Sequence, residues 1–364
     1  MKSRILLPAV AVVAVAGAFF AWRENAPPAK GEAPRAGASA QAAVASSSGA
    51  VGSIAAGPAP ISPGRTSAIR ATPVKHSLTA ELASARTYKA LYDRLAGSAE
   101  GQTADGQYAL YKILRACATV GDKKGAAARN NPEFQQQHRD YVASLPDSDP
   151  TKSRRLVALD KLGEDQCVGL NGLATTEAEL TKKLSDAAAA GSSAARTLQI
   201  EQDMWAERRI AGSNVRGGPT LSDGQMDTLR SALTSQDPEA LVNAGRVLAA
   251  NFRDITVRLG NDTAPIDRNA MMTAFTLAAC DYGYPCDDSN TRIVQACAFQ
   301  GYCEAGNLSD FITYYQSSPY QQQMLAQYQS TLRGAIQTGN SGVLQFQRGT
   351  TPPQPFPPGG FRRP

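Results

Sequence analysis

Between residues 77 and 345 the hydrophobic positions follow the spacing of amphipathic helices. Apolar side chains recur three and four positions apart, a period that gathers them on one face of a helix. The first series are Leu78, Leu82, Ala85, Tyr88, Leu91, Tyr92 and Leu95, then Tyr108, Tyr111, Leu114 and Ala118. Alternating apolar runs are short and β-branched residues seldom cluster. The pattern therefore predicts an all-α body of about ten to thirteen helices, with no sheet of appreciable size.

Helix-start signals recur along this body. Asn131-Pro132-Glu133 and Asp237-Pro238-Glu239 each place a capping residue before a proline at the first helical position. Capping boxes are predicted at Thr176–Glu179, Ser222–Gln225 and Ser318–Gln321. A glycine-rich loop at 212–220 divides the body into two predicted sub-bundles, 77–211 and 221–345.

The flanks of the body differ from it in composition. Met1 to Trp22 carries Lys2 and Arg4 at its start, followed by 18 residues without a charge. Such a segment is typical of an export signal, and its length and terminal Trp22 favour an uncleaved membrane anchor over a cleaved signal peptide. Residues 25–76, rich in Ala, Pro, Gly and Ser, and the proline-rich residues 346–364 have few apolar side chains to bury. They are predicted to be a disordered stalk and a disordered tail.

Six cysteines accompany this signal, an even number that fits disulfide formation in an oxidising compartment. Four of them lie between 280 and 303, with 5, 10 and 5 intervening residues. In each half of this segment a predicted helix ends at the first cysteine, and a glycine turn leads to the second. A short helix from 289 to 298, started by Asp287, Asp288 or Ser289, is predicted between the halves.

Geometry favours local pairing within each half. If the middle of the segment is helical, Cys286 and Cys297 lie about 15 Å apart, whereas a disulfide needs Cα atoms within about 7 Å. This separation excludes a bond between these two cysteines and disfavours the nested pairing, and the crossed pairing would be strained. We therefore predict the disulfides Cys280–Cys286 and Cys297–Cys303. The alternative is zinc ligation, although zinc-binding cysteines usually lie closer together in sequence.

The two remaining cysteines lie in the N-terminal half of the body. Cys117 is near the end of a predicted helix around 104–119, and Cys167 follows Leu162-Gly163. We predict that they form a disulfide, which would close a loop of about 50 residues. Two buried free thiols are the alternative.

Three stretches share a cadence of small and apolar residues: Asp105 to Leu110, Leu184 to Leu198 and Asp237 to Leu248. This cadence resembles that of Sel1-like and tetratricopeptide repeats, in which small residues let paired helices pack closely. The spacing C-x2-G-x2-C from Cys280 to Cys286, followed by a second cysteine pair, resembles uncharacterised exported or membrane-anchored proteins of proteobacteria. The resemblance implies an irregular helical bundle or degenerate α-solenoid, stapled by disulfides, that binds through a concave face. It implies no known activity.

The formal net charge of +5 belongs to the flanks. Residues 1–76 carry eight basic and two acidic residues, and residues 346–364 carry three arginines, so the body has a net charge of −4. A body of this charge argues against nucleic acid as a partner. The basic stalk suits anionic lipid headgroups or cell-wall polymer.

Candidate catalytic groups are few. The two histidines are His76, at the stalk junction, and His138, on a polar helix face where we expect a solvated imidazole. The sequence contains no HExxH, phosphate-loop or GxSxG motif, and it predicts no catalytic residue, cofactor site or metal site. A carboxylate pair for glycan hydrolysis stays open, because the body has 30 acidic residues.

Seven of the twelve tyrosines lie in the C-terminal part of the body, beside a group of glutamines. They are Tyr282, Tyr284, Tyr302, Tyr314, Tyr315, Tyr320 and Tyr328. Because tyrosine is common at recognition surfaces, these side chains are a predicted interaction face. The alternative is that they pack helices around the disulfides.

Together these features predict a non-enzymatic envelope protein, a helical interaction or scaffold module tethered to the membrane through residues 1–22. We expect it in the periplasm, anchored to the inner membrane, or secreted if the signal is cleaved, with a protein or an envelope polymer as partner. The alternative is a cell-envelope enzyme or glycan-binding protein that acts on cell-wall polymer. A binding module predicts a shallow groove, whereas an enzyme predicts a deep cleft holding a desolvated Glu or Asp.

Overall fold

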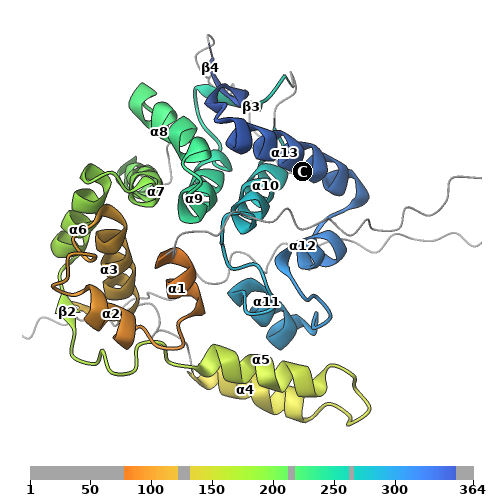
Figure 1. The fold of residues 1–364 in the computed structure, drawn as a ribbon. Coiled ribbons are helices and arrows are strands. Elements are labelled where there is room, and N and C mark those ends of the chain that lie inside the picture. Colours follow the sequence, from red (N-terminus) through yellow and green to blue (C-terminus); the bar gives the residue numbers. More distant parts are fainter. Residues whose placement is uncertain (1–77, 122–131, 212–217, 262–265, 350–364) are drawn as a thin grey trace, which may run out of the picture. The chain divides into compact units, whose positions relative to one another are not determined.

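The computed structural model describes residues 78–121, 132–211, 218–261 and 266–349 (Figure 1). The predicted membrane segment 1–22 and the predicted stalk 25–76 lie outside the described residues. All described elements belong to one compact unit, Ser67–Pro364. The two predicted sub-bundles are therefore parts of the same unit.

Helices make up most of the described chain. The first group is α1 Leu78–Ser84, α2 Lys89–Leu95, α3 Ala104–Cys117, α4 Pro132–Ala143, α5 Lys152–Gly163, α6 Glu177–Ala189 and α7 Ser193–Ala211. The second group is α8 Asp223–Thr234, α9 Pro238–Leu248, α10 Arg268–Cys280, α11 Thr291–Gln295, α12 Leu308–Phe311 and α13 Pro319–Thr338. Two of these continue as π-helical turns, η2 Ala296–Gln300 and η3 Ile312–Gln316, and η4 Ser341–Val343 is a 3-10 turn. The number of α-helices in the described residues falls within the predicted range.

Two small sheets were not predicted. Strand β1 Thr119–Val120 pairs in parallel with β2 Ala174–Thr175, and β3 Ile255–Leu259 pairs antiparallel with β4 Leu344–Arg348. In β3 the side chains at positions 255, 257 and 259 are buried or nearly so, which is the alternation of a half-buried strand. The prediction of a disordered tail from residue 346 is wrong for residues 346–348, because they pair with residues 255–257 of β3. The tail beyond residue 349 lies outside the described residues.

The predicted helix starts are confirmed where the structure describes them. The side chains of Thr176, Ser222 and Ser318 each accept a hydrogen bond from the backbone of the third helical residue, and that residue returns a bond to the cap. Asp237 caps α9 ahead of a proline, accepting from the amides of Glu239 and Ala240. These bonds satisfy amide groups that a helix start would otherwise leave without partners.

Helix α9 lies at the centre of the packing. Each helix of the series α3, α6, α7, α9, α10 and α13 packs against the next. Of the 11 residues of α9, nine are buried, and the remaining two are Glu239 and Arg246. At Gly245 the backbone of α9 comes so close to α10 that a Cβ atom would lie 2.7 Å from the Cβ of Phe275. Glycine is therefore required for this helix pair to approach so closely.

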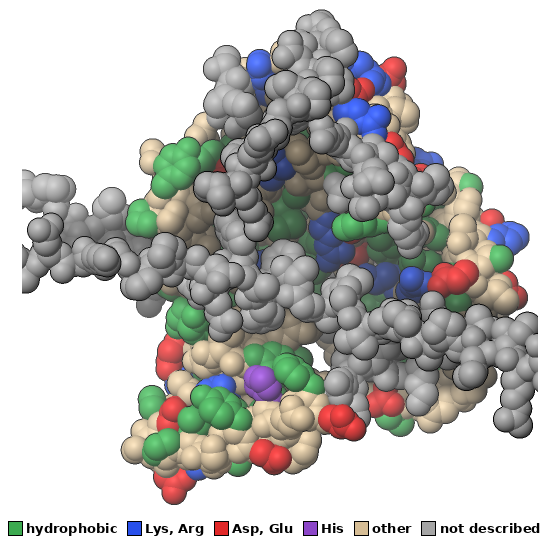
Figure 2. Space-filling view, turned by 180° about the vertical axis from the view of Figure 1, so that it is seen from behind, with side chains coloured by type: hydrophobic (Ala, Val, Ile, Leu, Met, Phe, Trp, Pro, Cys, Tyr) green, Lys and Arg blue, Asp and Glu red, His purple; other side chains and the backbone are tan. Residues whose placement is uncertain are grey.

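Helices α4 and α5 form a hairpin that packs on the cysteine segment (Figure 1). Their buried contact joins Val142 and Leu159 to Val294, Cys297 and Ala298 of α11 and η2. The expected solvated imidazole of His138 is wrong. The ring is half-buried, its centroid lying 4.6 Å from that of Phe134 and 4.8 Å from that of Phe299. Figure 2 shows a histidine beside hydrophobic side chains on this face.

Gly245→Ala should destabilise the protein by about 1–3 kcal/mol, because the added methyl group overpacks the α9–α10 contact. The matched control is Gly334→Ala, at an exposed position of α13 where a Cβ meets nothing within 4 Å. The control should be stabilised by up to about 1 kcal/mol, since alanine favours a helix over glycine. Urea unfolding of both variants measures the difference, and equal effects at the two positions would contradict the close approach.

Candidate functional site

The six cysteines form three disulfides in the predicted pairs. They are Cys117–Cys167, Cys280–Cys286 and Cys297–Cys303, with Cα–Cα distances of 5.3, 5.7 and 4.4 Å. Every cysteine sulfur is therefore bonded to another, and none is a free thiol or a thiolate that could bind zinc. The two local pairs each close six residues of chain beside a helix end.

The local structure of the cysteine segment follows its glycines and asparagine. Helix α10 ends at Cys280, and Gly283 and Gly301 adopt the left-handed φ values of +94° and +78° that favour glycine. The predicted cap at 287–289 is wrong: Asn290 caps α11. The Asp287 carboxylate instead accepts from the amide and hydroxyl of Ser289, which forms a turn ahead of the helix.

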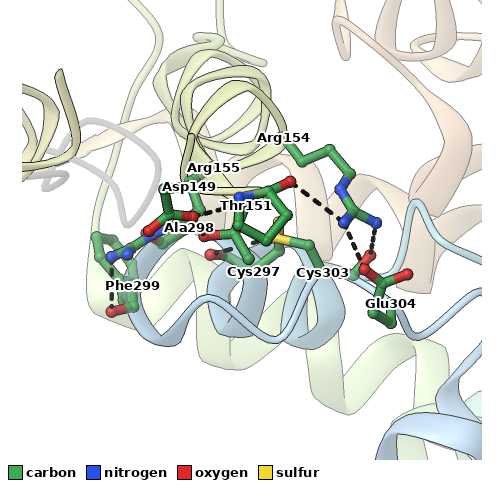
Figure 3. Close-up of a disulfide and its surroundings, with 10 residues drawn as sticks. Asp149, Thr151, Arg154, Arg155, Cys297, Ala298, Phe299, Cys303 and Glu304 are labelled. Atoms are coloured by element: carbon green, nitrogen blue, oxygen red, sulfur yellow. Dashed lines mark hydrogen bonds and ion pairs between the residues drawn. A yellow bond between two sulfur atoms is a disulfide. The ribbon is translucent and has the colours of Figure 1, made fainter. Parts of the chain in front are cut away.

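Two adjacent arginines of α5 bind η2 and the residues that follow it (Figure 3). The Arg155 side chain is only 7% exposed and donates to the carbonyls of Ala298, at 3.2 Å, and Phe299, at 3.4 Å. Arg154 lies at the surface, where it donates to the Cys303 carbonyl and pairs with Glu304. A guanidinium at a helix end compensates carbonyls that lack partners within the helix. Buried Arg155 thus fixes the second disulfide loop to the α4–α5 hairpin, and Arg154 adds contacts at the surface.

The structure divides the seven predicted tyrosines among different environments. Tyr314 and Tyr320 are exposed. Tyr282, Tyr284, Tyr302 and Tyr315 are partly buried against the core, and the rings of Tyr302 and Tyr315 stack at 4.6 Å. Tyr328 cannot belong to an interaction face, because it is 2% exposed and its hydroxyl accepts from the amide of Asp267. The structure does not bring these seven tyrosines together on a single face.

A second set of side chains lies along helices α7 and α9. We call it the α7–α9 surface: Glu201 and Trp205 of α7, with Glu239 and Arg246 of α9. The first pair is separated by four residues and the second by seven, spacings that place each pair on one face of its helix. The two charged residues of α9 are the ones that its burial leaves outside the core. Sequence reasoning missed this surface, although Trp205 is the only tryptophan of the body.

Glu239 is the charged centre of one end of this surface. Its carboxylate accepts from the hydroxyl of buried Tyr108 at 3.2 Å and from the ammonium of Lys112 at 3.4 Å. Buried Asn243 donates to the Tyr108 hydroxyl and to the carbonyl of Ala194, which ties α9 to both α3 and α7. The Glu239 carboxylate is thus held by two side chains of α3, and Asn243 links the same tyrosine to α7.

The charge of Glu239 affects the pKa of tyrosines from separate elements. Burial raises the pKa of Tyr88, Tyr108 and Tyr284, and the negative charge of Glu239 raises each of them further. Arg246 and Arg292 act in the opposite direction on the pKa of Tyr284. Desolvation lowers the pKa of Arg292. Perturbed groups from distant parts of the sequence therefore gather around Glu239.

The carboxyl group of Asp237 has a strongly raised pKa. Desolvation raises its pKa from 3.8 to about 6, although backbone hydrogen bonds act in the opposite direction. Its oxygens accept from the amides of Glu239 and Ala240 and, across the helix pair, from the amide of Ala194. Two of these amides belong to the start of α9 and one to α7, so the carboxyl group has a structural role.

The other end of the surface holds a pocket of about 240 Å³. It is lined by Glu201, Met204, Trp205, Arg246, Val247, Ala249, Ala250 and Asn251. Trp205 is 53% exposed, whereas Met204 is buried at the floor. The pocket combines an aromatic wall and an apolar floor with one acidic and one basic side chain, as ligand sites commonly do.

A polar groove lies between α6, α7 and α8. About 490 Å³ of open space is lined mainly by small and polar residues, among them Ser185, Gln199, Asp203, Gln225 and Thr228. Burial raises the pKa of Asp203. Asp227, in the adjoining space of about 150 Å³, forms an ion pair with Arg230 at 2.7 Å. This groove has fewer apolar contacts to offer a ligand than the pocket beside Trp205.

Comparison of the chain with protein-family models, with curated proteins and with solved structures finds no match. Within the described ranges, no helix combines the length and apolar character needed to cross a membrane. In the same part of the chain, no group of three or more His, Cys, Asp and Glu side chains is placed to hold a metal ion.

Arg155→Met should destabilise the protein by about 2–4 kcal/mol, because it removes two buried charged hydrogen bonds and leaves the carbonyls of Ala298 and Phe299 without donors. Arg154→Met is the matched control, since Arg154 is the next residue in the chain and its guanidinium lies at the surface. The control should leave the urea midpoint nearly unchanged. Urea unfolding and hydrogen exchange of residues 296–300 check this, and an Arg155 variant as stable as the control would refute the anchoring role.

Asp237→Asn should change how stability depends on pH. Between pH 3.8 and about 6 the folded state holds the Asp237 proton more tightly than the unfolded chain does. This group therefore stabilises the wild type at low pH, and the contribution is lost as the pH rises through this window. Above the window the contribution of Asp237 to stability no longer changes with pH. Relative to the variant, the wild type should lose about 2 kcal/mol between about pH 4.5 and about pH 7. Urea unfolding at both pH values gives the difference, and parallel curves would contradict a raised pKa.

Proposed function

We propose that this protein is a non-catalytic binding module that recognises its partner along the α7–α9 surface. The observation that carries the proposal is the pocket beside Trp205, in which Glu201 and Arg246 form no ion pair with each other or with another described residue. Charges of opposite sign that form no ion pair within the described chain are suited to a ligand that carries both. A partly exposed tryptophan adds the rigid apolar contact that dominates many binding sites.

The wider setting of the proposal is the cell envelope. The disulfides fit an oxidising compartment, and the apolar segment 1–22 fits export with retention at the membrane. We therefore propose a membrane-tethered helical module whose body faces the periplasm, with a protein or envelope polymer as partner. The resemblance to Sel1-like and tetratricopeptide repeats supports a binding role in the same way, because α7 and α9 pack along each other as repeated helices do.

The second candidate is a cell-envelope enzyme or glycan-binding protein acting on cell-wall polymer. Asp203 favours it, since it is a partly desolvated carboxyl group in an open groove. Glycan hydrolysis generally needs two carboxyl groups on either side of the scissile bond. Asp227, in the adjoining space, is engaged by Arg230, and Asp237 is engaged by three amides. The arrangement therefore favours binding over hydrolysis.

A photo-crosslinking amino acid in place of Trp205 should form one discrete adduct with the partner in intact cells. The same amino acid in place of Tyr320, which is 68% exposed on α13, is the matched control and should not form that adduct. Mass spectrometry identifies the adduct. No adduct at position 205, or the same adducts at both positions, would overturn the proposed surface. Release of soluble products from purified cell-wall glycan by the wild type would replace binding with catalysis.

A further inference from the structure

The pocket beside Trp205 has features that define the chemistry of its ligand. Its volume of about 240 Å³ suits a group the size of one amino-acid residue and is too small for a helix or a strand. Met204 and Val247 provide an apolar floor, and the partly exposed indole of Trp205 forms a wall. The apolar part of a ligand would be covered by these three side chains.

The acidic side of the pocket lacks a donor. The Oε2 atom of Glu201 is buried and has no hydrogen-bond partner within the part of the chain that the structure describes. A carboxylate oxygen in this condition is costly, and a charged donor would recover the most free energy. This buried acceptor favours an ammonium group at this side of the pocket.

The basic side of the pocket lacks an acceptor. Arg246 is exposed and makes no ion pair with any described residue, and the acidic residue that lines the same pocket is not within pairing distance of it. A guanidinium in such a place is suited to a carboxylate, which it can bind through two parallel hydrogen bonds.

We infer that this pocket binds the zwitterionic group of an α-amino acid, with its ammonium toward Glu201, its carboxylate toward Arg246 and an aliphatic side chain against Trp205 and Met204. The inference rests on the proposed function and names the chemistry of its partner. The zwitterion could be a free amino acid or an amino-acid group displayed on a peptide or polymer. The shared chemistry is the ammonium and carboxylate on one carbon atom.

The chain allows a direct optical test, because it has two tryptophans and one of them, Trp22, can be replaced. In the full chain carrying Trp22→Phe, the emission of Trp205 should change saturably with L-leucine. N-acetyl-leucine, which lacks the ammonium, and leucine amide, which lacks the carboxylate, should each bind about tenfold or more weakly. A γ-glutamyl tripeptide, which displays the zwitterion at its end, tests the polymer-borne source, and tighter binding of this peptide than of leucine would assign the site to a displayed group.

Matched variants separate the two charges. Glu201→Gln and Arg246→Gln should each weaken leucine binding about tenfold or more. The controls are Glu177→Gln and Arg115→Gln, which remove the same charges from an exposed ion pair between α3 and α6 and should leave the affinity unchanged. Circular dichroism establishes that each variant is folded. No saturable response to leucine or the peptide, or equal affinity for the blocked derivatives, would overturn the inference.

The two proposals fail in different ways. A discrete partner adduct at position 205 without any response to amino acids would leave the binding surface standing and remove the zwitterion. A saturable response to leucine without a partner adduct would leave the pocket standing and remove the protein or polymer partner.

Discussion

The near-complete burial of α9 is the constraint on which the rest of the structure depends. Small residues let α7, α8 and α10 pack around this helix, and Gly245 permits the closest approach. A helix surrounded in this way has a single line of residues left at its surface, and here that line holds Glu239 and Arg246. The burial of the other nine residues therefore determines where these charges lie. Rigid elements hold functional groups more accurately than loops do.

The polar network at the start of α9 orients this helix relative to its neighbours. Asp237, Glu239 and Asn243 connect it to α3 and α7 through hydrogen bonds that replace water lost on burial. A shifted carboxyl group can point to catalysis, but burial raises the pKa of Asp237, and its bonds to backbone amides give this residue a structural role. Near the opposite end of the helix, Arg246 forms no ion pair with any described residue, and the buried Oε2 atom of Glu201 on α7 has no hydrogen-bond partner among them. This contrast with the start of α9 is the physical basis for placing a binding site near Trp205.

Local features of the fold were predictable from the sequence because they depend on neighbouring residues. The capping boxes of Thr176, Ser222 and Ser318 and the two local disulfides each involve residues within six positions of each other. The register of β3 against β4 was missed because strands that short pair only through burial supplied by the rest of the bundle. The cap of α11 was missed because several polar residues precede this helix and only the turn at Asp287 selects among them.

Features that join distant parts of the chain were not predictable. The contact of Arg155 with the carbonyls of η2 spans 143 residues, and nothing in the spacing of the cysteines indicates it. The α7–α9 surface required knowing which two of eleven positions in α9 stay outside the core. The seven tyrosines illustrate the converse: they cluster in sequence, yet Tyr328 is buried and Tyr320 is exposed. Sequence proximity predicts a turn or a cap, but a surface is defined by packing.

Native-state hydrogen exchange of the full chain tests the central claim most directly. If α9 is enclosed by its neighbours, the amides of residues 242–248 exchange only when the whole body unfolds, and they rank among the slowest in the protein. Helix α4, which has exposed positions along most of its length, provides the internal reference. Exchange in α9 as fast as in α4 would contradict the account, because a helix that opens locally could not hold Arg246 and the pocket beside Trp205 in place.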